Sequence, residues 1–144
     1  MAKAYVDGSY NVKTQRFGYG VVLFTDAVTE DGSPELIKLS KGFSEPELAE
    51  MRNVAGEIMG AAQAMKSAAA RNIPELVIYH DYEGIAKWCT GEWKTKKKWT
   101  QKYKAFYEEM SRQLKISFVK VEAHSGDVYN DMADQLAKEA VGNK

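Results

Sequence analysis

The chain has 144 residues, of which 44% are apolar and 28% charged, a size and composition that exclude a disordered chain and leave no room for a second domain. The 20 basic and 20 acidic side chains cancel, so net charge alone indicates no partner. No apolar run is long enough to span a membrane and no secretion signal opens the chain, so we expect no membrane association. The single cysteine, Cys89, is expected to be a small buried residue in a cytoplasmic protein.

The first third of the chain predicts three strands joined by short turns. Three segments are rich in β-branched and aromatic residues, and polar turns separate them at 11–16 and 31–34. The expected strands are residues 3–10, 17–25 and 35–43. Because consecutive strands on short loops pair antiparallel, these segments predict a meander.

Helical patterns begin after the third strand. Ser44 has the position of a hydroxyl cap, with Pro46 and Glu47 early in the helix that follows. Helical periodicity continues to Asn72, either as one helix or as a short turn and a longer helix. Later segments read alternately as buried strands and helices. The strands are expected at 76–79 and 116–121, and the helices at 82–90, 99–113 and 130–141.

The resulting order is βββαβααβα. Strands that are joined through helices pair parallel, so the last two strands should extend the meander into a mixed sheet. The prediction is a single α/β domain over residues 1–144, with five strands, three antiparallel and two parallel, and helices packed on the sheet.

Four acids lie beside elements that are expected to be buried. Asp7 interrupts the first strand, Glu57 lies beside the apolar stripe of its helix, Asp81 follows a central strand, and Asp134 lies near the inner face of the last helix. Each alone could be a cap or a surface acid. Together they would repel one another unless a cation such as Mg²⁺ neutralised them. Spacing alone leaves both explanations open.

Five sequence blocks carry a resemblance to a known family. The blocks are YVDGSY (5–10), NVAGE (53–57), YHDY (79–82), AHSG (123–126) and NDMADQLA (130–137). In this order they resemble type 1 ribonuclease H, over about residues 3–141. The resemblance implies an RNase H-like fold and an endonuclease that hydrolyses the RNA strand of an RNA–DNA hybrid, leaving 5′-phosphate and 3′-hydroxyl ends.

By this resemblance, Asp7, Glu57, Asp81 and Asp134 would hold two Mg²⁺ ions, with Mn²⁺ as a substitute, and catalyse hydrolysis. Asp7 would bridge both ions. His124 matches a mobile histidine that assists proton transfer or product release; without the family context it would be an ordinary loop histidine.

The same resemblance implies a set of substrate contacts. Some residues would approach the 2′-hydroxyls that distinguish RNA from DNA, and others would follow the hybrid's backbone. The first group comprises Gly8, Ser9, Asn53 and Glu57, and the second comprises Trp88, Trp93, Lys96, Lys97 and Lys98. Asn130 is a further expected substrate contact, on the same helix face as Asp134. Alternatives remain open: Gly8 as a plain strand glycine, Asn130 as a helix cap, and the lysines as a solvated helix start.

The chain also departs from some family members. The segment after Trp88 is too short for the full basic handle, which bears on affinity and processivity but not on chemistry. Glu83 stands where some relatives have an amide, so we assign it no binding role, and His80 is expected to be structural.

Two other functions are compatible with these motifs. A structure-selective DNA nuclease would share the metal chemistry, and a non-catalytic RNase H-like domain would bind hybrids without cutting them. All four acids are present, which favours the enzyme. A nuclease domain from a reverse transcriptase would show the same activity. The expected partner is an RNA–DNA hybrid, and the expected state is a monomer.

Overall fold

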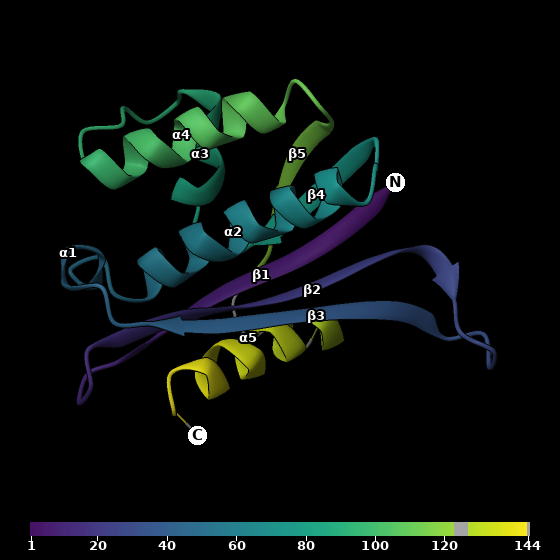
Figure 1. Ribbon diagram of the computed structural model, residues 1–144, viewed down its shortest axis with the longest axis horizontal. Helices are drawn as coiled ribbons and strands as arrows, with labels where there is room; N and C mark the ends of the chain where they lie inside the picture. The colour runs from purple at the N-terminus through teal and green to yellow at the C-terminus, as the bar shows by residue number, and fades with distance from the viewer. Residues whose placement is uncertain (123–126, 144) are drawn as a thin grey trace.

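The computed structural model describes residues 1–122 and 127–143, which form one five-stranded sheet with helices on both faces (Figure 1). The predicted element order is confirmed, with one helical segment divided in two. The strands are β1 (Ala2–Asn11), β2 (Arg16–Val28), β3 (Pro34–Phe43), β4 (Glu75–His80) and β5 (Lys115–Lys120). The helices are α1 (Pro46–Ala49), α2 (Asn53–Ala70), α3 (Gly84–Thr90), α4 (Lys98–Met110) and α5 (Val128–Ala140).

The sheet has the predicted mixed topology. Its strand order is β3-β2-β1-β4-β5; β1, β2 and β3 pair antiparallel, whereas β4 pairs parallel with β1 and β5. The central strands β1 and β4 place alternate apolar residues on the two faces, so both faces must be covered. No helix among the described residues has the length and apolar character needed to cross a membrane.

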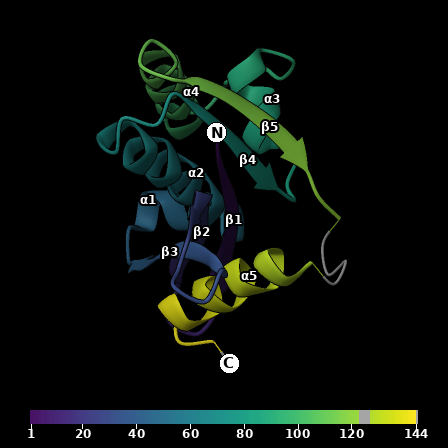
Figure 2. The same cartoon turned by 90° about the vertical axis from the view of Figure 1, so that its right-hand side faces the viewer.

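Two apolar layers enclose the sheet. Helices α2, α3 and α4 cover one face, and α5 crosses the other face beneath β1 and β2 (Figures 1 and 2). The larger core lies under α2 and α4 and includes Val6, Met65 and Ile78. The smaller core lies between the sheet and α5, around Tyr5 and Ala133. The candidate site therefore lies in a sheet whose two faces are both covered by helices.

The segment 46–72 is two helices rather than one. The chain turns sharply at Arg52, whose φ of 53° is unusual for a residue with a side chain. The Arg52 guanidinium lies 5.5 Å from the centre of the Tyr10 ring, a favourable cation–π contact between this turn and the end of β1. The turn directs the first residue of α2, Asn53, toward β1.

The predicted hydroxyl cap at Ser44 is wrong. The cap residue of α1 is Glu45, because Pro46 occupies the first helical position and its missing N–H suits only that place. The Ser44 hydroxyl instead accepts a hydrogen bond from Arg16 Nη1 at 2.9 Å. Ser44 thus joins the loop to β2.

Helix α2 lies against β1 and β2 at backbone-to-backbone distance. A Cβ built on Gly56 would lie 1.9 Å from the carbonyl oxygen of Gly18, and one on Gly8 would lie 2.0 Å from the carbonyl oxygen of Asn53. Both positions therefore require glycine for steric reasons, independently of backbone freedom. This approach sets Glu57, one residue along α2, beside β1.

The variant Gly56→Ala should be less stable than the unaltered chain. Alanine gains about 1 kcal/mol of helix propensity, but its methyl group would collide with backbone that cannot move aside, at a cost of about 3 kcal/mol or more. Urea denaturation should therefore show a net loss of about 2 kcal/mol. Gly60→Ala is the matched control and should cost less, because the nearest atoms to its Cβ belong to side chains, those of Tyr19 at 3.0 Å and Val21 at 3.6 Å, and not to backbone. Equal stability of all three proteins would contradict the close approach.

Candidate active site

The four predicted acids lie around the point where β1 and β4 separate. Their parallel pairing ends at Tyr5 and Tyr79, and β4 stops one residue later. Asp7 lies on β1 beyond the Tyr5–Tyr79 pair, and Asp81 is the first residue after β4. In α/β sheets, ligands bind outside the carboxyl ends of strands where neighbouring connections diverge. The topology therefore brings two of the acids to a ligand-binding position.

Asp7, Glu57 and Asp81 form a tight cluster. Each offers one carboxylate oxygen, and these three atoms lie within 4.8 Å of one another. Asp7 and Glu57 are 8% and 1% exposed, and Asp81 is half-buried. Three oxygen ligands at such spacing suit a hard divalent cation.

Glu57 also organises the turn that carries Asp81. Its Oε2 accepts hydrogen bonds from the backbone amides of Asp81 and Tyr82, at 3.2 and 3.4 Å. One residue of α2 thus fixes the start of the loop after β4. The relative positions of Glu57 and Asp81 follow from this contact together with the close packing of α2 on β1.

The cluster is electrostatically strained without a cation. Burial and the neighbouring Asp81 charge raise the pKa of Asp7 to about 8, and the same two causes raise the pKa of Glu57 well above its ordinary value. Uncompensated buried carboxylates favour protonation, whereas a bound cation would favour ionisation. The residues present therefore fit a divalent metal ion.

Asp134 lies beside Asp7 but is not one of the three acids whose oxygens lie within 4.8 Å of one another. It reaches the site from α5 and contributes to the raised pKa of Asp7. Its Oδ2 lies 2.9 Å from Lys138 Nζ, one helical turn further along. Asp134 lines an acidic pocket of about 150 Å³. The residues that line this acidic pocket are Asp7, Gly8, Asn53, Asp81, Asn130, Asp131 and Asp134.

Asn130 is not the cap of the last helix. Helix α5 begins at Val128, and the Asp127 carboxylate accepts hydrogen bonds from the amides of Tyr129 and Asn130, at 2.9 and 3.2 Å. An ionised cap satisfies the amides and also suits the positive end of the helix dipole. Asn130 is 5% exposed and faces the acidic pocket. His124 lies outside the described residues.

Gly8, Ser9 and Asn53 lie together next to the acids. With Asp134 and Lys138 they contribute to a second, more open pocket, which we call the Ser9 pocket. The Gly8 amide is already used, because it donates to Asp7 Oδ1 at 2.9 Å. The Ser9 hydroxyl accepts from Asn143 Nδ2 at 3.2 Å, which leaves its own proton for another acceptor.

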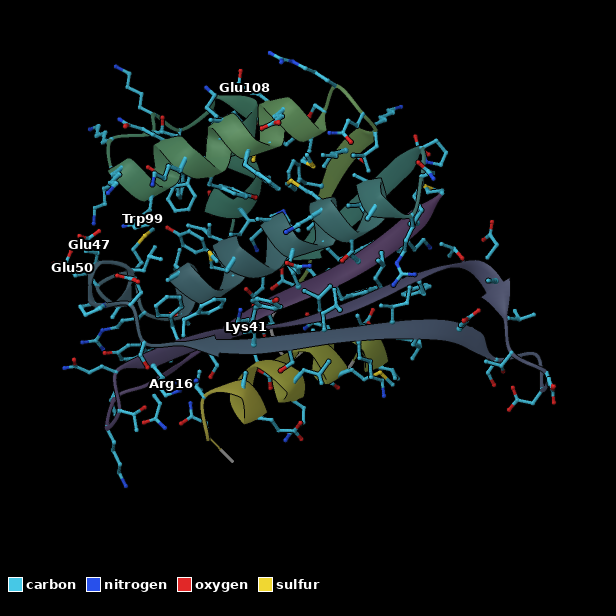
Figure 3. The ribbon with its side chains drawn as sticks, in the orientation of Figure 1. Arg16, Lys41, Glu47, Glu50, Trp99 and Glu108 are labelled. Carbon is cyan, nitrogen blue, oxygen red and sulfur yellow. The ribbon has the colours of Figure 1, made fainter. Side chains whose placement is uncertain are left out.

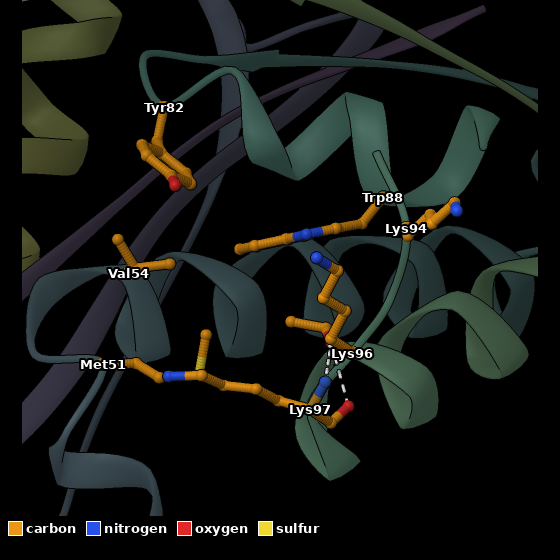
Figure 4. Close-up of a pocket in the computed structure, with 8 residues that line it drawn as sticks. Met51, Val54, Tyr82, Trp88, Lys94, Lys96 and Lys97 are labelled. Atoms are coloured by element: carbon orange, nitrogen blue, oxygen red, sulfur yellow. Dashed lines mark hydrogen bonds between the residues drawn. The ribbon is translucent and has the colours of Figure 1, made fainter. Parts of the chain in front are cut away.

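An apolar pocket with lysines at its rim lies beside the acids, where the turn before α2, the start of α2 and α3 meet the loop before α4. It has a volume of about 310 Å³, and we call it the aromatic–lysine pocket. Figure 4 shows the rings of Tyr82 and Trp88 facing Met51 and Val54 across it. Its remaining lining residues are Lys94, Lys96, Lys97 and Thr100.

Two predicted contacts do not line this pocket. Trp93 packs behind it, with ring centres 5.9 Å from Trp88 and 6.0 Å from Tyr82. Lys98 points toward α1, where Nζ lies 3.9 Å from Glu47 Oε2 and 5.2 Å from the centre of the Trp99 ring. Figure 3 shows Glu47 and Trp99 at the same edge of the molecule.

The predicted absence of a full basic handle agrees with the structure. Helix α3 ends at Gly91, whose φ is 87°, and residues 91–97 reach α4 without a helix. Glu83 forms an ion pair with Lys87, four residues along, which removes its charge from the acidic pocket. Cys89 is buried, and burial raises the pKa of its thiol to about 12, so it is no nucleophile.

Sequence reasoning missed several residues at the site. Lys138 could have been found, because its four-residue spacing from Asp134 puts both side chains on one helix face. Met51, Val54 and Tyr82 had no such signal, because they meet only through the arrangement of three separate elements.

The raised acid pKa values predict a metal-free stability that falls with pH. An unfolded aspartate releases its proton near pH 4, whereas folded Asp7 retains it up to a pKa of about 8. This contribution is therefore fully present below about pH 4 and lost as the pH rises toward about 8. Urea denaturation in EDTA should show a loss on the order of a few kcal/mol, and Mg²⁺ should restore most of it.

Asp81→Asn should flatten this profile, because the Asp81 charge raises the pKa of both buried acids. Glu30→Gln, in the exposed turn after β2, is the control and should leave the profile unchanged. A metal-free stability that stays constant from about pH 5 to pH 8 would contradict the cluster.

Comparison with known proteins gives a consistent picture. A model of the RNase H family matches residues 2–142. The human protein "Ribonuclease H1" is 33% identical over 98 residues, which cover 60% of this chain and 34% of that protein. A Wolbachia pipientis "Ribonuclease H" is 40% identical over 62 residues, covering 41% of this chain and 43% of its own length. The matched segments thus span less than half of these curated relatives.

Solved structures share the fold across the whole chain. RNase H1 from the archaeon Halobacterium salinarum superposes with a TM-score of 0.75 at 22% identity, covering 96% of each chain. LC11-RNase H1, solved in complex with an RNA/DNA hybrid, has a TM-score of 0.76 at 20% identity and covers 99% of this chain and 97% of its own. With a family match across nearly all its residues, this fold and this cluster of acids, the chain belongs to the RNase H family.

Proposed function

We propose that the chain is an endoribonuclease that hydrolyses the RNA strand of RNA–DNA hybrids with two divalent metal ions, leaving 5′-phosphate and 3′-hydroxyl ends. The observation that carries the proposal is the convergence of Asp7, Glu57 and Asp81 oxygens within 4.8 Å, with Asp134 beside them. The family match and the hybrid complex of LC11-RNase H1 support the substrate.

The four acids would hold Mg²⁺, or Mn²⁺ in its place. Bound there, the ions would lower the pKa of an attacking water and stabilise the departing 3′ oxygen. From β1, Asp7 places one carboxylate oxygen within 4.8 Å of an oxygen of Glu57 and of Asp81, and Glu57 holds the Asp81 turn with Oε2, so that its other oxygen remains for a ligand. By the family resemblance, His124 would assist proton transfer or product release.

The two pockets beside the acids suit the two strands of a hybrid. The Ser9 pocket offers the Ser9 hydroxyl and the exposed Asn53 side chain, groups that can pair with a 2′-hydroxyl. The aromatic–lysine pocket offers stacking surface from Tyr82 and Trp88, together with lysines for phosphates. Asn130, in the acidic pocket, would contact the substrate beside the scissile phosphate.

Two outer residues complete the proposed interface. Trp93 would act by supporting the Trp88 ring from behind. Lys98 would contact the hybrid at the edge of this surface, next to Glu47.

We also propose that residues 1–144 act as one monomeric domain in the cytoplasm, where the buried free thiol of Cys89 would stay reduced.

The direct test offers labelled RNA–DNA hybrid, duplex RNA, duplex DNA and single-stranded RNA in Mg²⁺ or Mn²⁺. We expect cleavage of the RNA strand of the hybrid alone, stopped by EDTA and by Asp7→Asn. Glu30→Gln, an exposed acid far from the cluster, should cut normally. Product ends should be ligatable 5′-phosphates and 3′-hydroxyls.

Each other outcome points elsewhere. Hybrid binding without cleavage by the unaltered chain would favour a non-catalytic hybrid-binding domain. Cutting of branched or duplex DNA would favour a structure-selective DNA nuclease. Cleavage that survives removal of metal would refute the two-ion mechanism.

The aromatic–lysine pocket should set affinity rather than chemistry. In an Asp7→Asn background, which prevents cutting, Lys96→Ala with Lys97→Ala should weaken hybrid binding and lower the salt dependence of log K by about one per lysine lost. Fluorescence anisotropy at several salt concentrations measures both. The control is Lys115→Ala. It removes an exposed lysine that pairs with Glu75 at the first residue of β5, at the end of the strand away from the Asp81 turn. An unchanged salt slope in the double variant would exclude the pocket from the interface.

A further inference from the structure

His80 is buried beside the metal cluster without taking part in it. It is the last residue of β4, it is 1% exposed, and its side chain lies on the same face of the sheet as Leu76 and Ile78. Its ring packs edge-on against Phe118, with ring centres 5.9 Å apart. A strand with aliphatic neighbours on this face gains little from an imidazole, whose polar nitrogens need partners once buried.

One ring nitrogen of His80 has a partner and the other has none among the described residues. Nδ1 lies 2.9 Å from the carbonyl oxygen of Tyr82, and Nε2 has no hydrogen-bond partner. Because a carbonyl oxygen only accepts, Nδ1 carries the proton and donates. A buried polar atom without a partner lowers stability, so a core-packing role alone would favour an apolar residue. What histidine adds at this position is the Nδ1 donor.

That donor completes a clamp around the turn after β4. Glu57 Oε2 accepts from the amides of Asp81 and Tyr82 on one side of the turn. On the other side, the Tyr82 carbonyl oxygen accepts a hydrogen bond from His80 Nδ1. It also accepts one, at 3.1 Å, from the amide of Ile85 in the first turn of α3. Glu57 therefore holds the two peptide groups that flank Asp81, and His80 holds the next peptide group, which links the turn to α3.

We propose that His80 is a positioning residue of the metal centre, whose Nδ1–H fixes the turn that keeps the Asp81 carboxylate beside Asp7 and Glu57. The role rests on the proposed metal-dependent function. The same turn carries Tyr82 into the wall of the aromatic–lysine pocket, so one clamp sets both the metal ligand and the adjoining stacking surface.

The test compares His80→Leu, which removes the donor, with His80→Asn, which keeps a nitrogen on Cγ where His80 has Nδ1. Isothermal titration with Mn²⁺ in the absence of nucleic acid measures the cluster alone. Loss of such outer-shell partners weakens metal binding by about tenfold or more. We expect that loss in His80→Leu and recovery of most of the affinity in His80→Asn.

Tyr103→Phe is the matched control for stability. It removes another buried side-chain bond to a backbone carbonyl, from Tyr103 Oη to Ile85 O at 2.7 Å, which lies within α3 and not among the groups that bind Glu57 or His80. It should lower the melting temperature without weakening Mn²⁺ binding. A separate measurement needs no metal: ring ¹⁵N chemical shifts of the unaltered chain should show His80 protonated at Nδ1.

The outcomes separate this role from the function on which it rests. If His80→Leu binds Mn²⁺ like the unaltered chain, or if His80→Asn is as weak as His80→Leu, the positioning role is wrong while the metal site stands. A ring protonated only at Nε2 would also refute it. If the unaltered chain binds no Mn²⁺, the metal centre itself fails, whatever the state of His80.

Discussion

The contact of α2 with the sheet at backbone distance determines the rest of the site. With glycine at positions 8 and 56, the first turn of α2 meets β1 and β2 without intervening side chains. Glu57 is thereby carried into a nearly water-free position next to Asp7. The arrangement of the acids is therefore a consequence of steric fit in the sheet and helix, and any residue with a Cβ at these glycines would push the layers apart.

The close grouping of buried acids lowers the stability of the fold, and it brings their oxygens together as a cation would need them. Buried carboxylates that raise one another's pKa oppose folding as they ionise, so the rest of the core must offset their repulsion. The hydrogen bonds from the Asp81 and Tyr82 amides to Glu57 hold the anions close together when no cation compensates them. A site of this kind needs little rearrangement to receive a cation, because its ligands already converge.

Much of the fold could be predicted from local patterns, and the differences arise where distant residues meet. Alternation and helical periodicity identified all five strands and placed the four acids on the correct elements. Local periodicity left open whether 46–72 is one helix or two, because no local pattern marks the positive φ of Arg52; its ring contact, Tyr10, lies forty-two positions away. The start of α5 was predicted at residue 130, with a capping role for Asn130 left open, whereas the helix begins at Val128 and Asp127 is its cap. The walls of the aromatic–lysine pocket required the tertiary arrangement itself.

The carboxyl-terminal segment is fastened to the end of β1, next to the site. Asn143 donates to the Ser9 hydroxyl and to the Tyr10 carbonyl, and Asn11 donates to the carbonyl of Val141, so the segment after α5 is fastened to the end of β1. Helix α5 otherwise rests on the smaller of the two cores. Fraying of the last helix would carry Asp134 away from Asp7 while the other three acids stayed in place, so a local opening at the carboxyl terminus is enough to dismantle the fourfold arrangement without unfolding the sheet.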